Sequence, residues 1–98
     1  MIAPPRIVVI DDDVSLTPSY QRCLRDFDVA CYSAEVGQVI DAIVAQPPDA
    51  LLLDFFLEET TGGEVIQQLR ARDVHIPILL MSGSFDVHRG AHEFSFGA

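Results

Sequence analysis

The stretch IVVIDDD, residues 7–13, decides the fold: four apolar residues run directly into three aspartates. A short apolar run without alternation is typical of a strand buried on both faces, as in a parallel sheet. A second run, ALLL at residues 50–53, ends in the same way at Asp54. Such sheets bind ligands beyond the carboxyl ends of their strands, where like charges repel each other unless a cation joins them. The two acidic strand ends therefore predict a divalent metal site built around Asp54.

The length and net charge of the chain limit the number of domains and the kinds of partner that we expect. The chain has 98 residues, 49% of them apolar, and a formal net charge of −9. This length suits one small domain over residues 1–98. Nucleic acids and anionic membranes are held mainly by Lys and Arg, so the acidic balance disfavours both as partners. All of the basic side chains are arginines, and the chain has no lysine.

The two cysteines and the absence of a targeting signal predict a cytoplasmic protein. Cys23 and Cys31 lack CxxC spacing, so we expect reduced thiols rather than a disulfide framework. No apolar stretch approaches the length of a membrane span, and residues 1–6 lack the features of a targeting signal.

Strand-length apolar runs alternate with helically spaced stretches along the chain. The predicted strands cover residues 6–10, 28–32, 50–53 and 78–81. Helices are predicted over residues 14–27 and 34–45 and from residue 62 onward, and residues 84–98 could form one more. This alternation predicts an α/β fold, a doubly wound parallel sheet with helices on both faces. In the flavodoxin-like strand order, 2-1-3-4 here, the ligand crevice lies between the first and third strands, the two that end in aspartate.

The chain resembles the receiver domains of bacterial two-component response regulators. Three motifs carry the resemblance: IDDD at residues 10–13, LLLD at residues 51–54 with Gly62 eight residues later, and LLMSG at residues 79–83. They cover essentially the whole chain, in the right order and at the expected strand ends. The resemblance implies a phosphorelay switch and not an enzyme.

In that family pattern Asp54 would accept a phosphoryl group from a histidine kinase, a phosphotransfer protein or a small phosphodonor. Asp11 and Asp12 would hold Mg²⁺. Asp54 itself and the backbone carbonyl of Phe56 would complete the protein ligands. Ser82 would donate its hydroxyl to a phosphoryl oxygen and draw the following loop inward. Positioning and electrostatics are nearly all that phosphoryl transfer requires of a protein.

Other interpretations stay open. The aspartate run could be a solvated turn, and Asp13 could cap a helix beginning at Val14. The family's lysine is missing, so a pseudo-receiver, an interaction module that carries no phosphate, is an alternative. Asp11, Asp13 and Val14 also fit the DxDxV pattern of haloacid-dehalogenase-like phosphohydrolases, with Ser82 as their second motif. Those enzymes also need a lysine, which disfavours them here.

The chain stops where the family's fifth strand would begin, so we expect an incomplete domain without that strand and its helix. The fourth strand, residues 78–81, would then form an exposed apolar sheet edge, and such edges recruit other strands. This edge, together with Phe85, Phe94 and Phe96 in the tail, predicts self-association, domain swapping or an origin in a longer protein.

Overall fold

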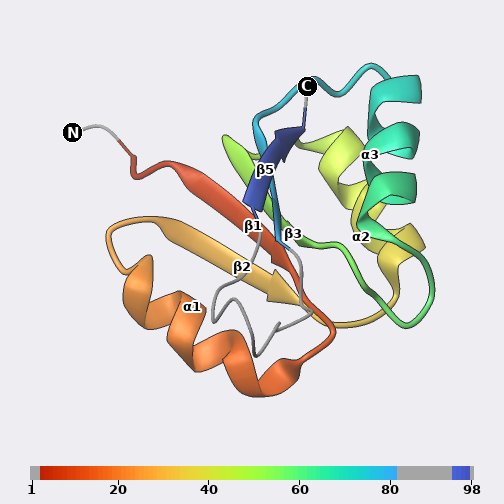
Figure 1. Ribbon diagram of the computed structural model, residues 1–98. Coiled ribbons are helices and arrows are strands. Elements are labelled where there is room, and N and C mark those ends of the chain that lie inside the picture. The colour runs from red at the N-terminus through yellow and green to blue at the C-terminus, as the bar shows by residue number, and fades with distance from the viewer. Residues whose placement is uncertain (1–2, 82–93, 98) are drawn as a thin grey trace.

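Four parallel strands form the centre of the fold (Figure 1). The computed structural model describes residues 3–81 and the backbone of residues 94–97. The parallel strands are β1 (Arg6–Ile10), β2 (Asp28–Tyr32), β3 (Ala50–Asp54) and β4 (Ile78–Met81). Their order is β2-β1-β3-β4, which confirms the predicted α/β architecture.

The strand register brings the two acidic strand ends together. Ile10 of β1 is paired with Leu53 of β3, so the residue after each, Asp11 and Asp54, lies at the same edge of the sheet. The apolar runs supply both sheet faces with buried side chains, which is why the strands form where the sequence predicts them.

The outer edge of β4 is covered, which corrects the prediction of an open edge. Strand β5 (Phe94–Gly97) pairs with β4 in antiparallel orientation, with Met81 opposite Phe94. The unpaired backbone groups of β4 thus find partners within the same chain, and an antiparallel pair needs no helical crossover. The helix considered for residues 84–98 is therefore wrong at residues 94–97, and the rest of that segment lies outside the described residues. The open edge that motivated self-association is not present.

Helices α2 (Val36–Ala45) and α3 (Gly62–Ala71) pack on one face of the sheet and enclose the main core. Their apolar residues recur at helical spacing and meet alternate residues of the strands. The buried members of this core are Val8, Ile10, Val36, Val39, Ile40, Ile43, Leu51, Leu53, Val65, Leu69, Val74 and Ile78. This packing fixes the strands whose ends carry the aspartates.

The opposite face carries a short 3₁₀ turn, η1 (Val14–Leu16), and helix α1 (Thr17–Cys23). The helix predicted to reach Phe27 ends at Cys23, where the Leu24 N–H still donates to the carbonyl of Tyr20 at 2.9 Å. No residue of α1 is buried. Tertiary packing therefore supports this helix much less than it supports α2 and α3.

Helix α2 begins later than predicted. The predicted helix starts at residue 34, but Glu35 is the N-cap residue and adopts a left-handed conformation with φ 57°. The Glu35 N–H donates to the Glu59 carboxylate at 2.8 Å. A side chain from the β3–α3 loop therefore fixes the start of α2, a contact that local sequence patterns do not reveal.

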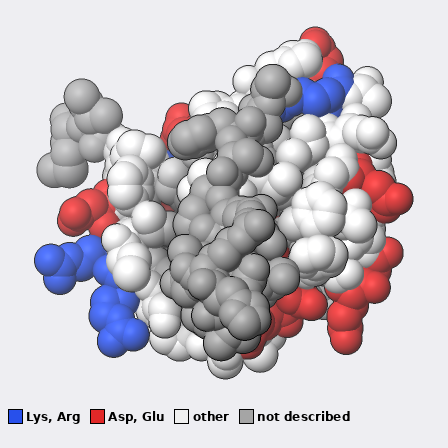
Figure 2. Space-filling view, viewed as in Figure 1, with Lys and Arg blue, Asp and Glu red and all other residues white. Residues whose placement is uncertain are grey.

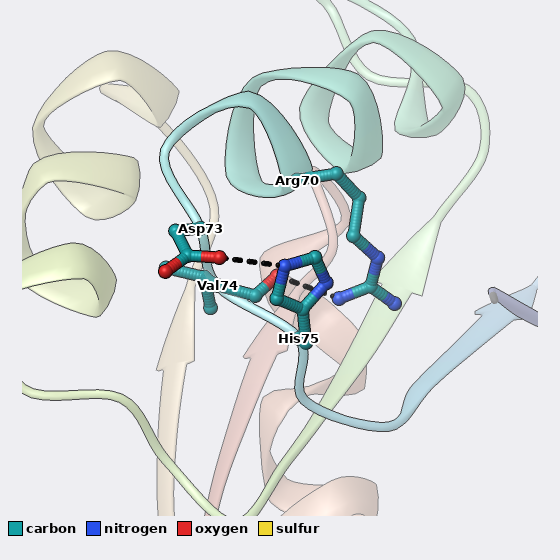
Figure 3. Close-up of polar contacts among 4 residues, drawn as sticks. All are labelled: Arg70, Asp73, Val74 and His75. Atoms are coloured by element: carbon teal, nitrogen blue, oxygen red, sulfur yellow. Dashed lines mark hydrogen bonds and ion pairs between the residues drawn. The ribbon is translucent and has the colours of Figure 1, made fainter.

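The chain turns from α3 into β4 through a polar corner (Figure 3). The Arg70 guanidinium donates to the carbonyls of Val74, at 2.7 Å, and Ile76, at 3.1 Å. His75 Nε2 lies 2.9 Å from an Asp73 carboxylate oxygen, and Asp73 has a left-handed φ of 62°. A basic side chain in the last helical turn thus satisfies carbonyls of the connection and sets the entry to β4.

Two features bear on the expected cellular setting. Within the described ranges, no helix has both the length and the apolar character needed to cross the bilayer. Cys23 and Cys31 are both free thiols, the first exposed and the second half-buried.

Candidate functional site

Three carboxylates converge at the carboxyl ends of β1 and β3. One oxygen each from Asp11, Asp12 and Asp54 can be chosen so that all lie within 4.8 Å of one another. Asp11 is 9% exposed and Asp54 is 5% exposed, whereas Asp12 lies at the surface. The structure therefore brings together the three side chains that the sequence analysis selected as ligands.

Backbone pairing continues one residue past the strands and fixes these positions. The Asp11 N–H donates to the carbonyl of Tyr32 at 3.0 Å, and the Phe55 N–H donates to the carbonyl of Met81 at 2.7 Å. Both acidic residues therefore stand on rigid backbone rather than on a free loop. Rigid support of this kind is what a precise ligand geometry requires.

The Asp11 carboxylate is held by two donors. The Asp13 N–H donates to Asp11 Oδ1 at 3.0 Å, and the Tyr20 hydroxyl donates to Asp11 Oδ2 at 2.7 Å. The sequence analysis did not include Tyr20 among the site residues and so missed the second contact. Buried tyrosines usually find a partner for the hydroxyl, and that tendency was the available signal.

Asp13, the third aspartate of the run, has a different role. It is the N-cap residue of η1, and its carboxylate accepts from the Ser15 N–H at 3.0 Å. The capping alternative considered for Asp13 is thus confirmed. The run of three aspartates divides into two carboxylates at the site, Asp11 and Asp12, and one helix cap.

The environment of Asp54 disfavours its charged form. Burial raises the pKa of this carboxyl from its ordinary value of 3.8 to about 6, and the charges of Asp11 and Asp12 act in the same direction. The Phe56 N–H, 3.4 Å from Asp54 Oδ1, opposes this increase in pKa. Burial, a hydrogen bond to Asp11 and the charge of Asp11 also raise the pKa of Tyr20. A divalent cation would relieve this crowding of negative charge.

Gly62 closes the loop behind Asp54. Its N–H donates to the carbonyl of Phe55 at 2.7 Å. A Cβ atom at position 62 would lie 2.6 Å from Leu80 Cδ1 and 2.8 Å from the Asp54 carbonyl oxygen. The start of α3 can approach the end of β3 this closely only because residue 62 is glycine.

The loop after β3 carries Phe56 at its exposed side. The Phe56 ring is 54% exposed and meets the Phe55 ring edge to face at a centroid distance of 4.9 Å. Backbone bridges tie the loop together, because Phe56 is paired with Thr61 and the Leu57 N–H donates to the Thr60 carbonyl at 3.2 Å. The Phe56 carbonyl, predicted as a metal ligand, therefore belongs to an ordered loop. Ser82, predicted as the switch residue, lies outside the described residues.

The donor set fits a hard divalent cation. All three side chains offer carboxylate oxygens, which suit Mg²⁺ better than soft transition metals. Two oxygens on opposite sides of Mg²⁺ lie about 4.2 Å apart. The carboxylates are within 4.8 Å of one another, so small side-chain movements suffice to close around an ion.

The surface charge agrees with the acidic composition. On the described part of the face in Figure 2, acidic side chains spread along the margins and arginines gather at separate places rather than in one patch. On this described part of the face, the arginines form no continuous stripe.

Comparison with known proteins identifies the family. The family model described as response regulator receiver domain matches residues 7–98. Response regulator MprA of Mycolicibacterium vanbaalenii is 33% identical over 99 residues, covering 97% of this chain and 42% of the relative. The DNA-binding transcriptional regulator NtrC of Klebsiella pneumoniae is 28% identical over 91 residues, covering 92% of this chain and 19% of the relative. The chain thus spans less than half the length of these relatives.

A solved structure shares the fold. The CheY-like receiver domain protein from Methanospirillum hungatei superposes with a TM-score of 0.74 at 18% identity, covering 88% of this chain and 70% of that chain. The sheet order, the acidic strand ends and the family match agree. This chain belongs to the response regulator receiver domain family.

Proposed function

We propose that the domain is the phosphoacceptor of a two-component phosphorelay, with Asp54 as the residue that takes the phosphoryl group. The observation that carries the proposal is the convergence of Asp11, Asp12 and Asp54 within 4.8 Å at the carboxyl ends of two rigid strands. The family match supports the class of signalling protein. The phosphoryl donor would be a histidine kinase, a phosphotransfer protein or a small phosphodonor.

The transfer requires one bond to form and one to break. A carboxylate oxygen of Asp54 would attack the phosphorus atom and form an acyl phosphate, while the bond from phosphorus to the donor's nitrogen or oxygen breaks. Asp11, Asp12, Asp54 and the Phe56 carbonyl would hold Mg²⁺. When bound, Mg²⁺ would offset the charge on the phosphoryl oxygens and on the carboxylates. The ordered backbone of both strand ends would keep Asp54 in line with the incoming phosphorus.

Ser82 is proposed as the residue that responds to the phosphoryl group. It follows Met81 directly, and Met81 is the register partner of Asp54 at the end of β4. A hydroxyl at that point of the chain could donate to a phosphoryl oxygen on Asp54. The loop after β4 would then move and change the affinity for a partner protein.

One structural observation disfavours the phosphohydrolase alternative. Asp13, the second aspartate of the DxDxV pattern, caps η1, and its carboxylate accepts from Ser15. The group of carboxylates that could hold a metal contains Asp12 instead. The pseudo-receiver alternative differs only in whether Asp54 is modified, so an experiment decides between them.

Acetyl phosphate labelling followed by intact-protein mass spectrometry tests the proposal. We expect the chain to gain the mass of one phosphoryl group with Mg²⁺ present and none with excess EDTA. Asp54→Asn should abolish the gain. Asp49→Asn is the matched control, because Asp49 directly precedes the same strand and contacts the Arg6 backbone at 2.7 Å. Unchanged labelling of Asp54→Asn would reject the proposal, and Mg²⁺ binding without labelling would identify a pseudo-receiver.

The proposal extends to the cellular location and the partner of the domain. We propose that residues 1–98 act as one receiver domain in the cytoplasm, with a kinase or phosphotransfer protein as partner. The net charge of −9 supports a partner other than nucleic acid or membrane for this domain. The longer relatives carry further sequence beyond the matched part, and the proposal concerns the receiver domain alone.

A further inference from the structure

The Tyr20 hydroxyl lies over the acidic site. It donates to Asp11 Oδ2 at 2.7 Å and lies 3.7 Å from Met81 Sδ. Asp11 follows β1, Met81 ends β4, and these two strands are the neighbours of β3 in the sheet. A single oxygen atom that contacts both neighbours must lie across the end of β3, where Asp54 stands.

Tyr20 also joins α1 to this end of the sheet. Thr17 and Tyr20 are the residues of α1 that are partly buried, and the helix has no fully buried residue. A tyrosine that served packing alone could direct its hydroxyl to solvent. Here the hydroxyl instead donates a short hydrogen bond to a nearly buried carboxylate.

Two donors occupy part of the Asp11 carboxylate and leave its other lone pairs free to bind a cation. The Asp13 N–H occupies one lone pair of Oδ1 and the Tyr20 hydroxyl occupies one lone pair of Oδ2. The carboxylate plane is therefore fixed, with the remaining lone pairs available to an ion shared with Asp12 and Asp54. Donors behind a ligating group orient it in this way, and their removal commonly costs tenfold to a hundredfold in metal affinity.

We propose that Tyr20 is a positioning residue of the cation site: its hydroxyl holds Asp11 in the orientation that binds Mg²⁺. The inference rests on the proposed function, because it requires that Asp11, Asp12 and Asp54 share an ion. The hydrogen bond also withdraws charge from Asp11, which alone would weaken its bond to a cation. The orienting effect outweighs this loss, because a carboxylate free to rotate must be ordered again at each binding event.

The Mg²⁺ dissociation constant, measured by titration calorimetry, tests the proposal on the intact chain. Tyr20→Phe keeps the ring and removes the hydroxyl, and we expect it to weaken Mg²⁺ binding about tenfold. Tyr32→Phe is the matched control, because Tyr32 ends the neighbouring strand and its side chain is 40% exposed. Its dissociation constant should stay within about twofold of the unmodified chain.

The Mg²⁺ dependence of acetyl phosphate labelling separates positioning from a general structural effect. We expect Tyr20→Phe to raise the half-saturating Mg²⁺ concentration about tenfold while the initial rate at saturating Mg²⁺ changes less than about twofold. A loss of the saturated rate with an unchanged dissociation constant would overturn the proposal. So would a Tyr20→Phe chain that does not fold, because the hydroxyl would then be a structural requirement.

The Mg²⁺ binding results distinguish failure of the Tyr20 role from failure of the proposed phosphoacceptor function. If the unmodified chain binds no Mg²⁺, both proposals fail. If it binds Mg²⁺, and Asp12→Asn weakens binding while Tyr20→Phe binds as tightly as the unmodified chain or more tightly, the role of Tyr20 alone is rejected.

Discussion

The described helices on the two faces of the sheet differ in how deeply they are buried. On the α2 and α3 face, fully buried side chains such as Leu53 and Leu69 join strands to helices. On the other face, α1 has no buried residue and meets the end of the sheet through Tyr20. The acidic side chains point to this second face, the one that carries α1, since Asp11 and Asp54 alternate with Ile10 and Leu53.

The core beneath α2 and α3 stabilises the fold, whereas the face that carries α1 also carries the acidic site. Packing of one face holds β1 and β3 in register, so the carboxylates can be gathered on the other despite their repulsion. Two elements lie beside the site, α1 and the β3–α3 loop. They are held by hydrogen bonds that the binding of a cation or a phosphoryl group can alter. Regions that move in regulation are generally drawn from such less stable parts of a protein.

Truncation of a core leucine should show the largest contrast between the faces. Leu69 is fully buried, so Leu69→Ala should lower the free energy of unfolding by about 3 kcal/mol through lost burial and a cavity. Leu16→Ala, at a side chain 39% exposed beside α1, should cost less than about 1 kcal/mol. Urea unfolding measures both. Equal losses would break the comparison between the faces.

Gly62→Ala should have the next largest effect, because it forces apart the start of α3 and the end of β3. The new methyl group would collide with Leu80 and with the Asp54 carbonyl, at a cost of about 2 kcal/mol. Gly37→Ala is the control, since nothing lies within 4 Å of the added atom in α2. It should stabilise the domain by about 0.5 kcal/mol. A neutral Gly62→Ala would show that the close approach is not required.

Asp54→Asn should stabilise the domain without metal at neutral pH. The folded-state pKa of Asp54, about 6, lies above its ordinary value of 3.8, so the folded chain binds this proton more readily. Stability therefore falls as pH rises from about 4 to 6, and the full cost is present above that window. We expect a gain of about 1 to 2 kcal/mol at pH 7.5 in EDTA.

Most of this gain should be lost when unfolding is measured near pH 3.5, because Asp54 is then mostly protonated in both states. Urea unfolding of Asp54→Asn and of the unmodified chain at the two pH values provides the comparison. Equal stability at pH 7.5 would contradict the account of a repelled, buried carboxylate on the α1 face.

Removal of the ion pair between α2 and α3 should have the smallest effect. Arg72 and Asp41 lie 2.6 Å apart, but their side chains are 46% and 70% exposed. Solvent screens such a pair, so Arg72→Ala should change the free energy of unfolding by less than about 0.5 kcal/mol. A double-mutant cycle with Asp41→Ala measures the coupling. A coupling above about 1 kcal/mol would contradict this screening and show that the ion pair adds to the apolar contact between these helices.

The sequence was a good guide to the parallel strands and to the meeting of the carboxylates. The apolar runs predict β1 and β3 because burial on both faces leaves a local signal, whereas β2 has no buried residue and was predicted from a short alternating stretch. Asp11 and Asp54 could be predicted to meet because the flavodoxin-like strand order places the first and third strands side by side. The family resemblance assigned Asp11 and Asp12 to the site and left Asp13 as a possible helix cap, and the structure confirms that Asp13 caps η1.

Other features could not be predicted because they depend on distant parts of the chain. Strand β5 exists through pairing with β4, and its segment carries no strong local pattern. The Glu59 contact that starts α2 joins residues from two different loops. The Tyr20 hydrogen bond depends on where α1 lies on the sheet, which the spacing of its apolar residues does not specify.

The most direct test of the site compares two neighbouring aspartates. Asp12 belongs to the group of three carboxylates, whereas Asp13 caps η1. The account predicts that Asp12→Asn weakens Mg²⁺ binding at least about tenfold, while Asp13→Asn leaves the calorimetric dissociation constant within about twofold. Equal effects of the two substitutions, or a larger effect of Asp13→Asn, would contradict a cation site made of Asp11, Asp12 and Asp54.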